Sequence, residues 1–309
     1  MKKVVSTRNL SREEWLRYRK QGIGGSDAGA VCGLNPYSSA MQIFADKTGD
    51  MVSEYDNEAM RQGRDFEDYV AGRFAEETGK KVRKANFMYM DEKHPFMLAD
   101  IDRLVTGERA GLECKTVSPY SADKWKDGQI PPHYKIQCYH YMAVLNLDCC
   151  YIAALIFGKE FVFHKIESDE EIIQNLRTIE KDFWENHVLK GEPPEPDGSE
   201  AASEWIRKAF PEAKQGKVVP LYGFDERLKR RQEVSELMEK LKTEKEQIEQ
   251  ALKLYLGEAE EAGSERYRIS WKNITSARLD TKRLKQENPD IYRRYSTENV
   301  SRRLAIRPV

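Results

Sequence analysis

Three charged side chains on two neighbouring apolar stretches have the residue types and the spacing of a metal-dependent catalytic site. Asp102 lies near the end of one apolar run, and Glu113 and Lys115 lie two residues apart in the next. Side chains two apart in a β-strand point to the same face, so Glu113 and Lys115 share a face of a strand predicted over 111–117. Carboxylate oxygens, open positions for water and phosphate, and a nearby ammonium group suit chemistry with a hard divalent cation.

A second acid precedes Asp102 in the same apolar run. Residues 96–106 predict another strand, in which Asp100 and Asp102 occupy one face. A connection through 107–111 would place Asp102 beside Glu113. The two strands together would then present a pair of carboxylates.

The acid-x-lysine triplet is not selective by itself. It also occurs at Asp91–Lys93, Glu212–Lys214 and Asp280–Lys282. The strand context and the upstream acid distinguish Glu113 from these three sites. A surface ion pair across the two strands is the alternative interpretation of the same residues.

Glu67 adds a third carboxylate, on a helix predicted over 57–78. Its helical neighbours are small or apolar: Gly63, Val70, Ala71 and Phe74. Residues three and four apart share a helix face, so Glu67 lies on the inward face, where an unpaired charge is costly. A metal ion or an internal salt bridge would each satisfy Glu67, and the sequence leaves both open.

Two further pairs of residues could handle a phosphate group. Gln137 and Tyr141 are one turn apart on a helix predicted over 131–145, where they would position a scissile phosphate or the lysine, or fill the core with a satisfied amide. Arg19 and Ser26 flank a glycine-rich turn that begins another helix. Free N–H groups and a guanidinium would bind an anion there; a simple helix cap by Ser26 is the alternative.

These residues need a scaffold that brings them together. The order of helices, strands and a hairpin predicts an α/β core with a mixed central sheet flanked by helices. The predicted elements are helices over 11–22, 26–34, 57–78, 131–145 and 169–190 and strands over 85–90, 96–106, 111–117, 151–157 and 160–166. The proline-rich segment 191–198 predicts a boundary between a core of residues 1–198 and an extension of residues 199–309.

The extension predicts a helical and αβ unit. Residues 225–262 form a long, highly charged predicted helix, and 267–272 and 303–307 alternate as strands do. Apolar side chains recur every seven residues in the helix, at Val234, Leu241, Ile248 and Tyr255. Glu244 interrupts the companion seam, which favours a helix packed on its own protein over an autonomous coiled coil.

Composition predicts a charge-rich soluble protein without a membrane span. The 309 residues are 39% hydrophobic and 33% charged. The start of the chain lacks an apolar signal segment, and the five cysteines include no C-x-x-C pair, which predicts reduced thiols in a cytoplasm. We find no Walker-type phosphate loop, dinucleotide fingerprint, or serine or cysteine nucleophile motif.

The net charge of −1 hides an asymmetry along the chain. Residues 266–309 contain 12 Lys+Arg and 4 Asp+Glu, a net charge of +8, so the remainder carries −9. An acidic body is consistent with a carboxylate metal site, and a basic tail with a polyanionic partner. A solvated surface element would explain the tail equally well.

Together the motifs resemble the YqaJ-type viral recombinases, relatives of phage lambda exonuclease within the PD-(D/E)xK nuclease superfamily. The resemblance covers about residues 8–195, in the order and spacing of the family, and implies a restriction-endonuclease-like core. It is carried by Arg19-x-x-x-x-Gly24-x-Ser26-Asp27, Gly63-Arg64-x-x-Glu67, Asp102, Glu113-x-Lys115 and Gln137-x-x-x-Tyr141.

The resemblance implies a magnesium-dependent exonuclease, with Mn²⁺ able to substitute, that digests one strand of linear duplex DNA from its 5′ end. Asp102 and Glu113 would be the central metal ligands, Glu67 an outer ligand, and Lys115 the group that orients or activates the attacking water. The remaining motif residues are the Q-x-x-x-Y pair, Gln137 and Tyr141, and the pocket for a terminal 5′ phosphate, Arg19 and Ser26.

The same resemblance implies partners. The 3′-ended single strands would serve phage homologous recombination by passing to a phage single-strand-annealing protein in the bacterial host cytoplasm. Ring-shaped homo-oligomers occur in the family. The substrate would be the ends of double-stranded DNA.

One departure and two rival functions stay open. Ile101 stands where relatives often have proline, which keeps Asp100 open as a substitute for Asp102. One rival is a structure- or sequence-selective endonuclease of the same superfamily, including helicase-associated types, although the cysteine spacing does not suit an iron–sulfur member. The other is a non-catalytic DNA-end-binding protein, which the complete set of three acids and a lysine argues against.

Overall fold

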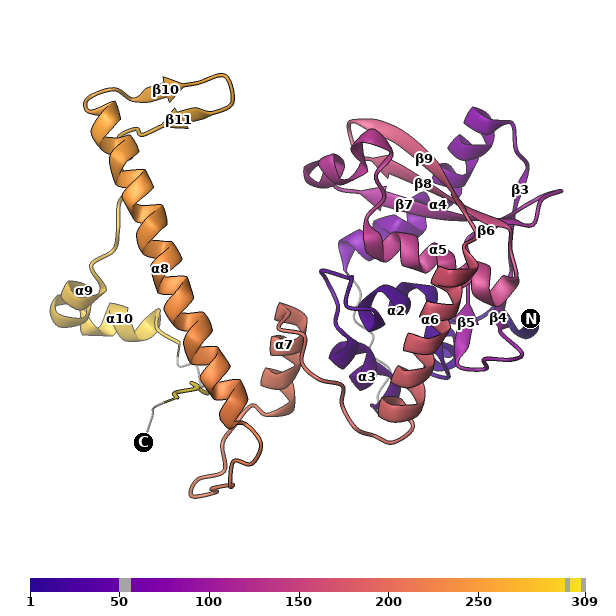
Figure 1. Cartoon of the computed structure of the whole chain (residues 1–309), viewed down its shortest axis with the longest axis horizontal. Helices are drawn as coiled ribbons and strands as arrows, with labels where there is room; N and C mark the ends of the chain where they lie inside the picture. Colours follow the sequence, from indigo (N-terminus) through magenta and orange to yellow (C-terminus); the bar gives the residue numbers. More distant parts are fainter. Residues whose placement is uncertain (50–56, 298–300, 307–309) are drawn as a thin grey trace. The chain divides into compact units, whose positions relative to one another are not determined.

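The computed structural model describes residues 1–49, 57–297 and 301–306, which form two compact units (Figure 1). The first unit is Met1–Phe210 and the second is Pro211–Val309.

The boundary between the units lies beyond the segment predicted from the sequence. Helix α7 (Glu200–Ala209) follows the proline-rich stretch and packs against α3 (Ala40–Thr48). These contacts make α7 part of the first unit, whereas the sequence placed it in the extension.

A five-stranded mixed sheet organises the first unit, as predicted. Its order is β3-β6-β7-β8-β9, in which only β7 and β8 run parallel. The predicted hairpin is confirmed as β8–β9, formed by the strands predicted over 151–157 and 160–166. The strands are β3 (Val82–Lys84), β6 (Arg103–Val105), β7 (Ala110–Val117), β8 (Cys149–Ile156) and β9 (Glu160–Glu167).

A second sheet of four strands corrects one prediction. Its strands, in order, are β1 (Lys2–Ser6), β4 (Phe87–Met90), β5 (Met97–Ala99) and β2 (Ile23–Gly24). The single strand predicted over 96–106 is wrong, because β5 pairs in this sheet and β6 in the five-stranded one. The chain changes sheets between them, so Asp100 and Asp102 do not share a face of one strand.

Two helices cover opposite faces of the five-stranded sheet. On one face, α4 (Glu58–Thr78) packs on β7 and β8. On the other, α5 (Pro132–Leu145) packs on the same strands and also reaches β4 and β5. Every residue from Gln137 to Leu145 is buried, as expected for a helix that is enclosed on all sides.

Two further helices of the first unit pack against α5. Helices α2 and α6 contact it directly. The predicted helix over 169–190 ends at Asp182 and continues as a π-helical turn, Phe183–Val188. The other elements are α1 (Arg12–Arg19), α2 (Gly25–Val31), α6 (Glu170–Asp182) and a 3₁₀ segment, Pro119–Gly128.

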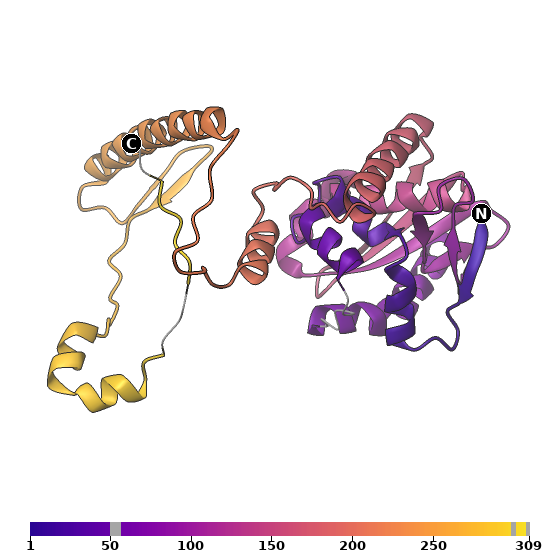
Figure 2. The same ribbon diagram turned by 90° about the horizontal axis from the view of Figure 1, so that it is seen from below.

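The second unit is built on one long helix (Figure 1). The predicted helix ends earlier than 262, because Gly257 takes a positive φ of 55° and the chain turns into a hairpin. Residues 303–306 are not a strand, which corrects that prediction; Arg307 lies outside the described residues. The elements, seen from below in Figure 2, are α8 (Asp225–Leu256), β10 (Glu261–Gly263), β11 (Arg268–Ser270), α9 (Thr281–Glu287) and α10 (Pro289–Arg294).

The apolar series of α8 remains exposed. Val234, Leu241, Ile248 and Tyr255 are 39–85% exposed, and Leu256 is the buried residue of the helix. The packing predicted for this face is not present among the residues that the structure describes. In the same described segments, no helix has the length and apolar character needed to span a membrane.

Candidate active site

Strands β6 and β7 separate at the position of Asp102. Their pairing covers Arg103 with Leu112 and Leu104 with Gly111. At the next position the Asp102 Oδ2 accepts the backbone N–H of Cys114 at 2.7 Å. The Asp102 carboxylate thus takes the place of a main-chain acceptor. It lies beside Cys114, the residue that follows Glu113.

Glu113 is a buried carboxylate whose two oxygens differ. Its side chain is 5% exposed. Oε1 accepts hydrogen bonds from Lys115 Nζ and Gln137 Nε2, both at 2.6 Å. Oε2 is buried and has no hydrogen-bond partner among the residues that the structure describes. A buried acceptor without a donor is costly, so this oxygen is suited to a ligand.

Gln137 and Tyr141 lie on one face of α5, as predicted. Gln137 Oε1 accepts from Lys115 Nζ at 3.0 Å, and Gln137 Nε2 donates to the Tyr141 hydroxyl at 2.9 Å. The ammonium of Lys115 also lies 4.6 Å from the centre of the Tyr134 ring. Side chains from α5 thereby fix the lysine against Glu113.

Glu67 approaches from α4 but is bound by an arginine. Arg103 Nη1 donates to Glu67 Oε1, and Arg103 Nη2 donates to Asp68. The internal salt bridge that the sequence left open is therefore present. In the described parts of the chain, no three acidic, histidine or cysteine side chains converge as a ready-made metal shell.

Electrostatics nevertheless favour a cation at this cluster. Burial raises the pKa of Asp102, and repulsion by Glu113 and Glu67 raises it further. Burial also raises the pKa of Glu113, and the opposing effect of Lys115 does not cancel the shift. Acids that repel one another around an unpartnered oxygen fit a divalent cation.

Lys115 stays protonated in this environment. Burial alone would lower its pKa, but Glu113, Tyr134 and Asp102 together outweigh burial and raise the pKa. The group is therefore available as a cation and hydrogen-bond donor.

Asp100 has its own partner. The indole N–H of Trp15, on α1, donates to Asp100 Oδ2 at 2.5 Å. Burial raises the pKa of Asp100. Asp100 is therefore bound by a side chain of α1, whereas the carboxylate of Asp102 is bound by the backbone of β7.

A second charged cluster contains the residues predicted to bind phosphate. Arg19 Nη2 donates to Ser26 Oγ at 2.8 Å and to Asp27 Oδ1 at 2.6 Å. Lys47 Nζ donates to Asp27 Oδ2 at 2.7 Å. Burial opposes ionisation of Asp27, but Arg19 and Lys47 outweigh burial and hold its pKa well below the usual range.

The start of α2 differs from the predicted cap. Gly24 occupies the N-cap position and its N–H donates to Asp27 Oδ2 at 3.0 Å, so Ser26 lies inside the helix. Gly25 packs tightly against the neighbouring helix, since a β-carbon there would lie 2.5 Å from Cε1 of Tyr141. The two clusters therefore adjoin through Gly25 and Tyr141.

Three side chains that hold site residues were not among the residues predicted from the sequence. Arg103, Lys47 and Trp15 hold Glu67, Asp27 and Asp100 respectively. The position of Arg103 next to Asp102 was a usable signal. Lys47 and Trp15 carry no local signal, because their partners are distant in the sequence.

Solved structures define the class of this fold. The alkaline exonuclease LHK-Exo of Laribacter hongkongensis matches with a TM-score of 0.50 at 20% identity, over 64% of this chain and 97% of that chain. Its complex with dAMP matches with the same TM-score and coverage at 21% identity. The first unit therefore has the fold of an alkaline-exonuclease-type nuclease.

Sequence comparison defines the family. Residues 14–148 match the YqaJ-like viral recombinase domain. The protein YqaJ of Bacillus subtilis (strain 168) is 38% identical over 99% of this chain and 97% of its own length. The chain belongs to the YqaJ-like viral recombinase family.

Proposed function

We propose that the protein is a magnesium-dependent 5′-to-3′ exonuclease that acts on linear double-stranded DNA and leaves 3′ single strands. The observation that carries the proposal is the buried, unpartnered Oε2 of Glu113 beside the ammonium of Lys115. Family membership and the exonuclease fold support it.

The chain would hold the metal through Asp102 and Glu113, with Glu67 as an outer ligand. When bound, Mg²⁺ or Mn²⁺ would supply Lewis acidity to the phosphodiester and lower the pKa of a water molecule. Lys115 would orient that water or stabilise charge on the phosphate.

Residues of α5 prepare Lys115 for this role. The amide oxygen of Gln137 accepts from the ammonium, and the amide N–H of Gln137 reaches both Glu113 and Tyr141. These contacts limit the rotation of the lysine without neutralising it. An oriented charged donor is worth more in a buried site than in water.

Arg19 and Ser26 would bind the terminal 5′ phosphate. The side chain of Arg19 is 23% exposed, and its guanidinium would bind the phosphate in addition to Asp27. A charge-assisted contact of this kind would fix the strand end and impose the 5′-to-3′ direction.

Partners and location follow from the same proposal. The 3′ strands would pass to a phage single-strand-annealing protein in the host cytoplasm, and a homo-oligomeric ring would retain the DNA. The basic residues of 266–309 would contact DNA phosphates or that partner, in which case affinity falls with added salt.

One experiment tests the reaction. Linear 5′-phosphorylated duplex is incubated with the protein and Mg²⁺ or a chelator, with strands labelled at either end. We expect nucleotides released from the 5′ end only with metal. Cleavage of circular or end-blocked DNA would instead indicate an endonuclease, and binding without cleavage would indicate a DNA-end-binding protein.

A further inference from the structure

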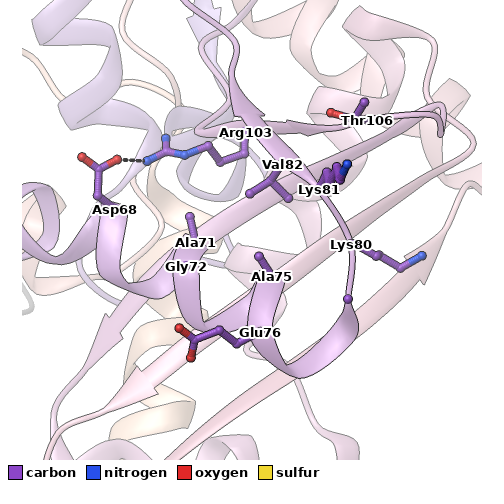
Figure 3. A pocket seen from close by; sticks show the side chains of 11 residues that line it. Asp68, Ala71, Gly72, Ala75, Glu76, Lys80, Lys81, Val82, Arg103 and Thr106 are labelled. Atoms are coloured by element: carbon purple, nitrogen blue, oxygen red, sulfur yellow. Dashed lines mark hydrogen bonds and ion pairs between the residues drawn. The ribbon is translucent and has the colours of Figure 1, made fainter.

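Arg103 is a buried arginine that touches two parts of the acidic cluster. Its side chain is 4% exposed. Nη1 donates to Glu67 Oε1 and to the main-chain oxygen of Asp102, the latter at 2.7 Å, while Nη2 donates to Asp68. Figure 3 shows the guanidinium of Arg103 directed at Asp68, at one end of a groove.

The backbone of Arg103 cannot shift easily. Arg103 lies opposite Leu112 of β7 on one side and Lys84 of β3 on the other. A guanidinium also presents its donors in a fixed planar fork. The position of the group that holds Glu67 is therefore determined by the sheet rather than by α4.

The surroundings of Arg103 are open to solvent on one side. A groove of about 770 Å³ runs beside the second half of α4, and the side chain of Glu67 is 31% exposed. The ion pair therefore offsets desolvation of the nearly enclosed Arg103 more than of Glu67. The same contact also restricts how the Glu67 carboxylate points. The groove is lined in part by Asp68, Gly72, Lys80, Lys81, Arg103 and Thr106.

We propose that Arg103 is a positioning residue for the metal site: it holds Oε1 of Glu67, so that Oε2 is the oxygen presented to a cation bound by Asp102 and Glu113. The inference rests on the proposed function, because it assigns a cation to those acids. An ion pair with a purely structural role is the competing explanation.

The test measures Mn²⁺ affinity of the free full-length protein, without DNA, by electron paramagnetic resonance. Arg103→Met keeps the aliphatic stem and removes the fork. We expect affinity to fall by about 10- to 100-fold, the usual cost of losing a partner of a metal ligand. Arg103→Lys keeps the charge without the fork and should give an intermediate loss.

A matched control and a double variant separate positioning from structure. Lys84→Met removes the other cation on Asp68 and should leave Mn²⁺ affinity within about twofold, since exposed ion pairs contribute little. In a Glu67→Gln background, Arg103→Met should cause little additional loss, because Arg103 acts through Glu67.

Three results would overturn the proposal. Unchanged Mn²⁺ affinity in folded Arg103→Met, or tighter binding, would make the arginine structural or a competitor of the cation. A full loss that persists with Glu67→Gln would show that Arg103 does not act through Glu67. If Arg103→Met does not fold, Arg103→Lys decides the same questions. Wild-type protein that binds Mn²⁺ but does not digest DNA would refute the proposed function, not the role of Arg103.

Discussion

Two buried acidic clusters in the first unit have opposite charge balance. Asp27 lies between Arg19 and Lys47, and its pKa is lowered well below the usual range despite burial. Asp102 and Glu113 lie close to each other and to Glu67, and their pKa values are raised by burial and by this repulsion. The acidic side chain of the first cluster is balanced by neighbouring cations, whereas the acidic side chains of the second lack enough neighbouring positive charge.

The difference distinguishes an acid that neighbouring cations already neutralise from acids that lack enough neighbouring positive charge. Arg19 and Lys47 both bind Asp27, and Asp46, 3.7 Å from Lys47, balances the second cation. In the cluster of Asp102 and Glu113, Lys115 Nζ donates to one oxygen of Glu113, and the other oxygen has no hydrogen-bond partner in the described part of the chain. Charge balance, rather than residue type, therefore separates the two roles.

Glu113→Gln is the substitution that tests the difference between the two clusters most strongly. The amide keeps the shape and an acceptor for Lys115 but lacks the charge that the cation requires. We expect DNA cleavage to fall by several orders of magnitude, as is common when a group that stabilises the transition state is lost. Glu108→Gln, on the exposed ion pair with Lys80, is the control and should keep wild-type turnover.

Asp27→Asn should cause the largest loss of stability. It leaves Arg19 and Lys47 without their shared carboxylate, and breaking a buried pair in this way costs about 3–5 kcal/mol. Urea unfolding in a chelator measures the change. A free energy of unfolding equal to wild type would show that the cluster is not held together by Asp27.

Asp102→Asn and Asp100→Asn compare the two acids that precede β6. Asp102 contacts β7 beside Glu113, whereas Asp100 is bound by Trp15. We expect Asp102→Asn to weaken Mn²⁺ binding by at least about 10-fold and Asp100→Asn to change it little. A titration in which only the Asp100 variant loses affinity would reverse the assignment.

Arg19→Ala and Ser26→Ala test the cluster around Asp27. Removing a charge-assisted contact costs about 1.5–3 kcal/mol, so Arg19→Ala should reduce the preference for 5′-phosphorylated over 5′-hydroxyl ends by about 10-fold or more. Ser26→Ala should have a smaller effect. Competition between the two duplexes measures this preference, and unchanged discrimination in both variants would leave the cluster with a structural role alone.

The smallest expected effect is on pH dependence in the metal-free protein. Because the folded state raises the pKa of Asp102, the folded state binds that proton more tightly, and stability from this group decreases as pH rises through the raised pKa. Asp27 acts oppositely: its contribution is full above its ordinary pKa of about 4 and is lost as pH falls below it.

Urea unfolding in a chelator at several pH values tests the sign for Asp102. The stability of Asp102→Asn relative to wild type should increase with pH, at about 1.4 kcal/mol for each unit by which the pKa is raised. A relative stability that decreases with pH would mean that Asp102 has a positive partner in the metal-free protein.

Strand and helix periodicity were enough to predict the local geometry of the candidate site. Because side chains alternate along a strand, Glu113 and Leu112 were expected on opposite faces of the sheet. Leu112 packs with Val70 and Phe74 of α4. The period of a helix placed Gln137 and Tyr141 on one face. These relations depend only on backbone geometry, which is the same in every strand and helix.

The partners that these side chains contact depend on the tertiary structure. The sequence predicted one strand where the chain changes sheets at Asp100–Asp102. Arg103 is notable in the sequence only for its place beside Asp102, and no local pattern pairs it with Glu67 or pairs Lys47 with Asp27. Each of these pairs joins different elements, so the contact exists only after the sheets and helices have packed. A local pattern fixes the direction of a side chain relative to its own backbone, whereas the balance of charge around it depends on residues brought together by the whole fold.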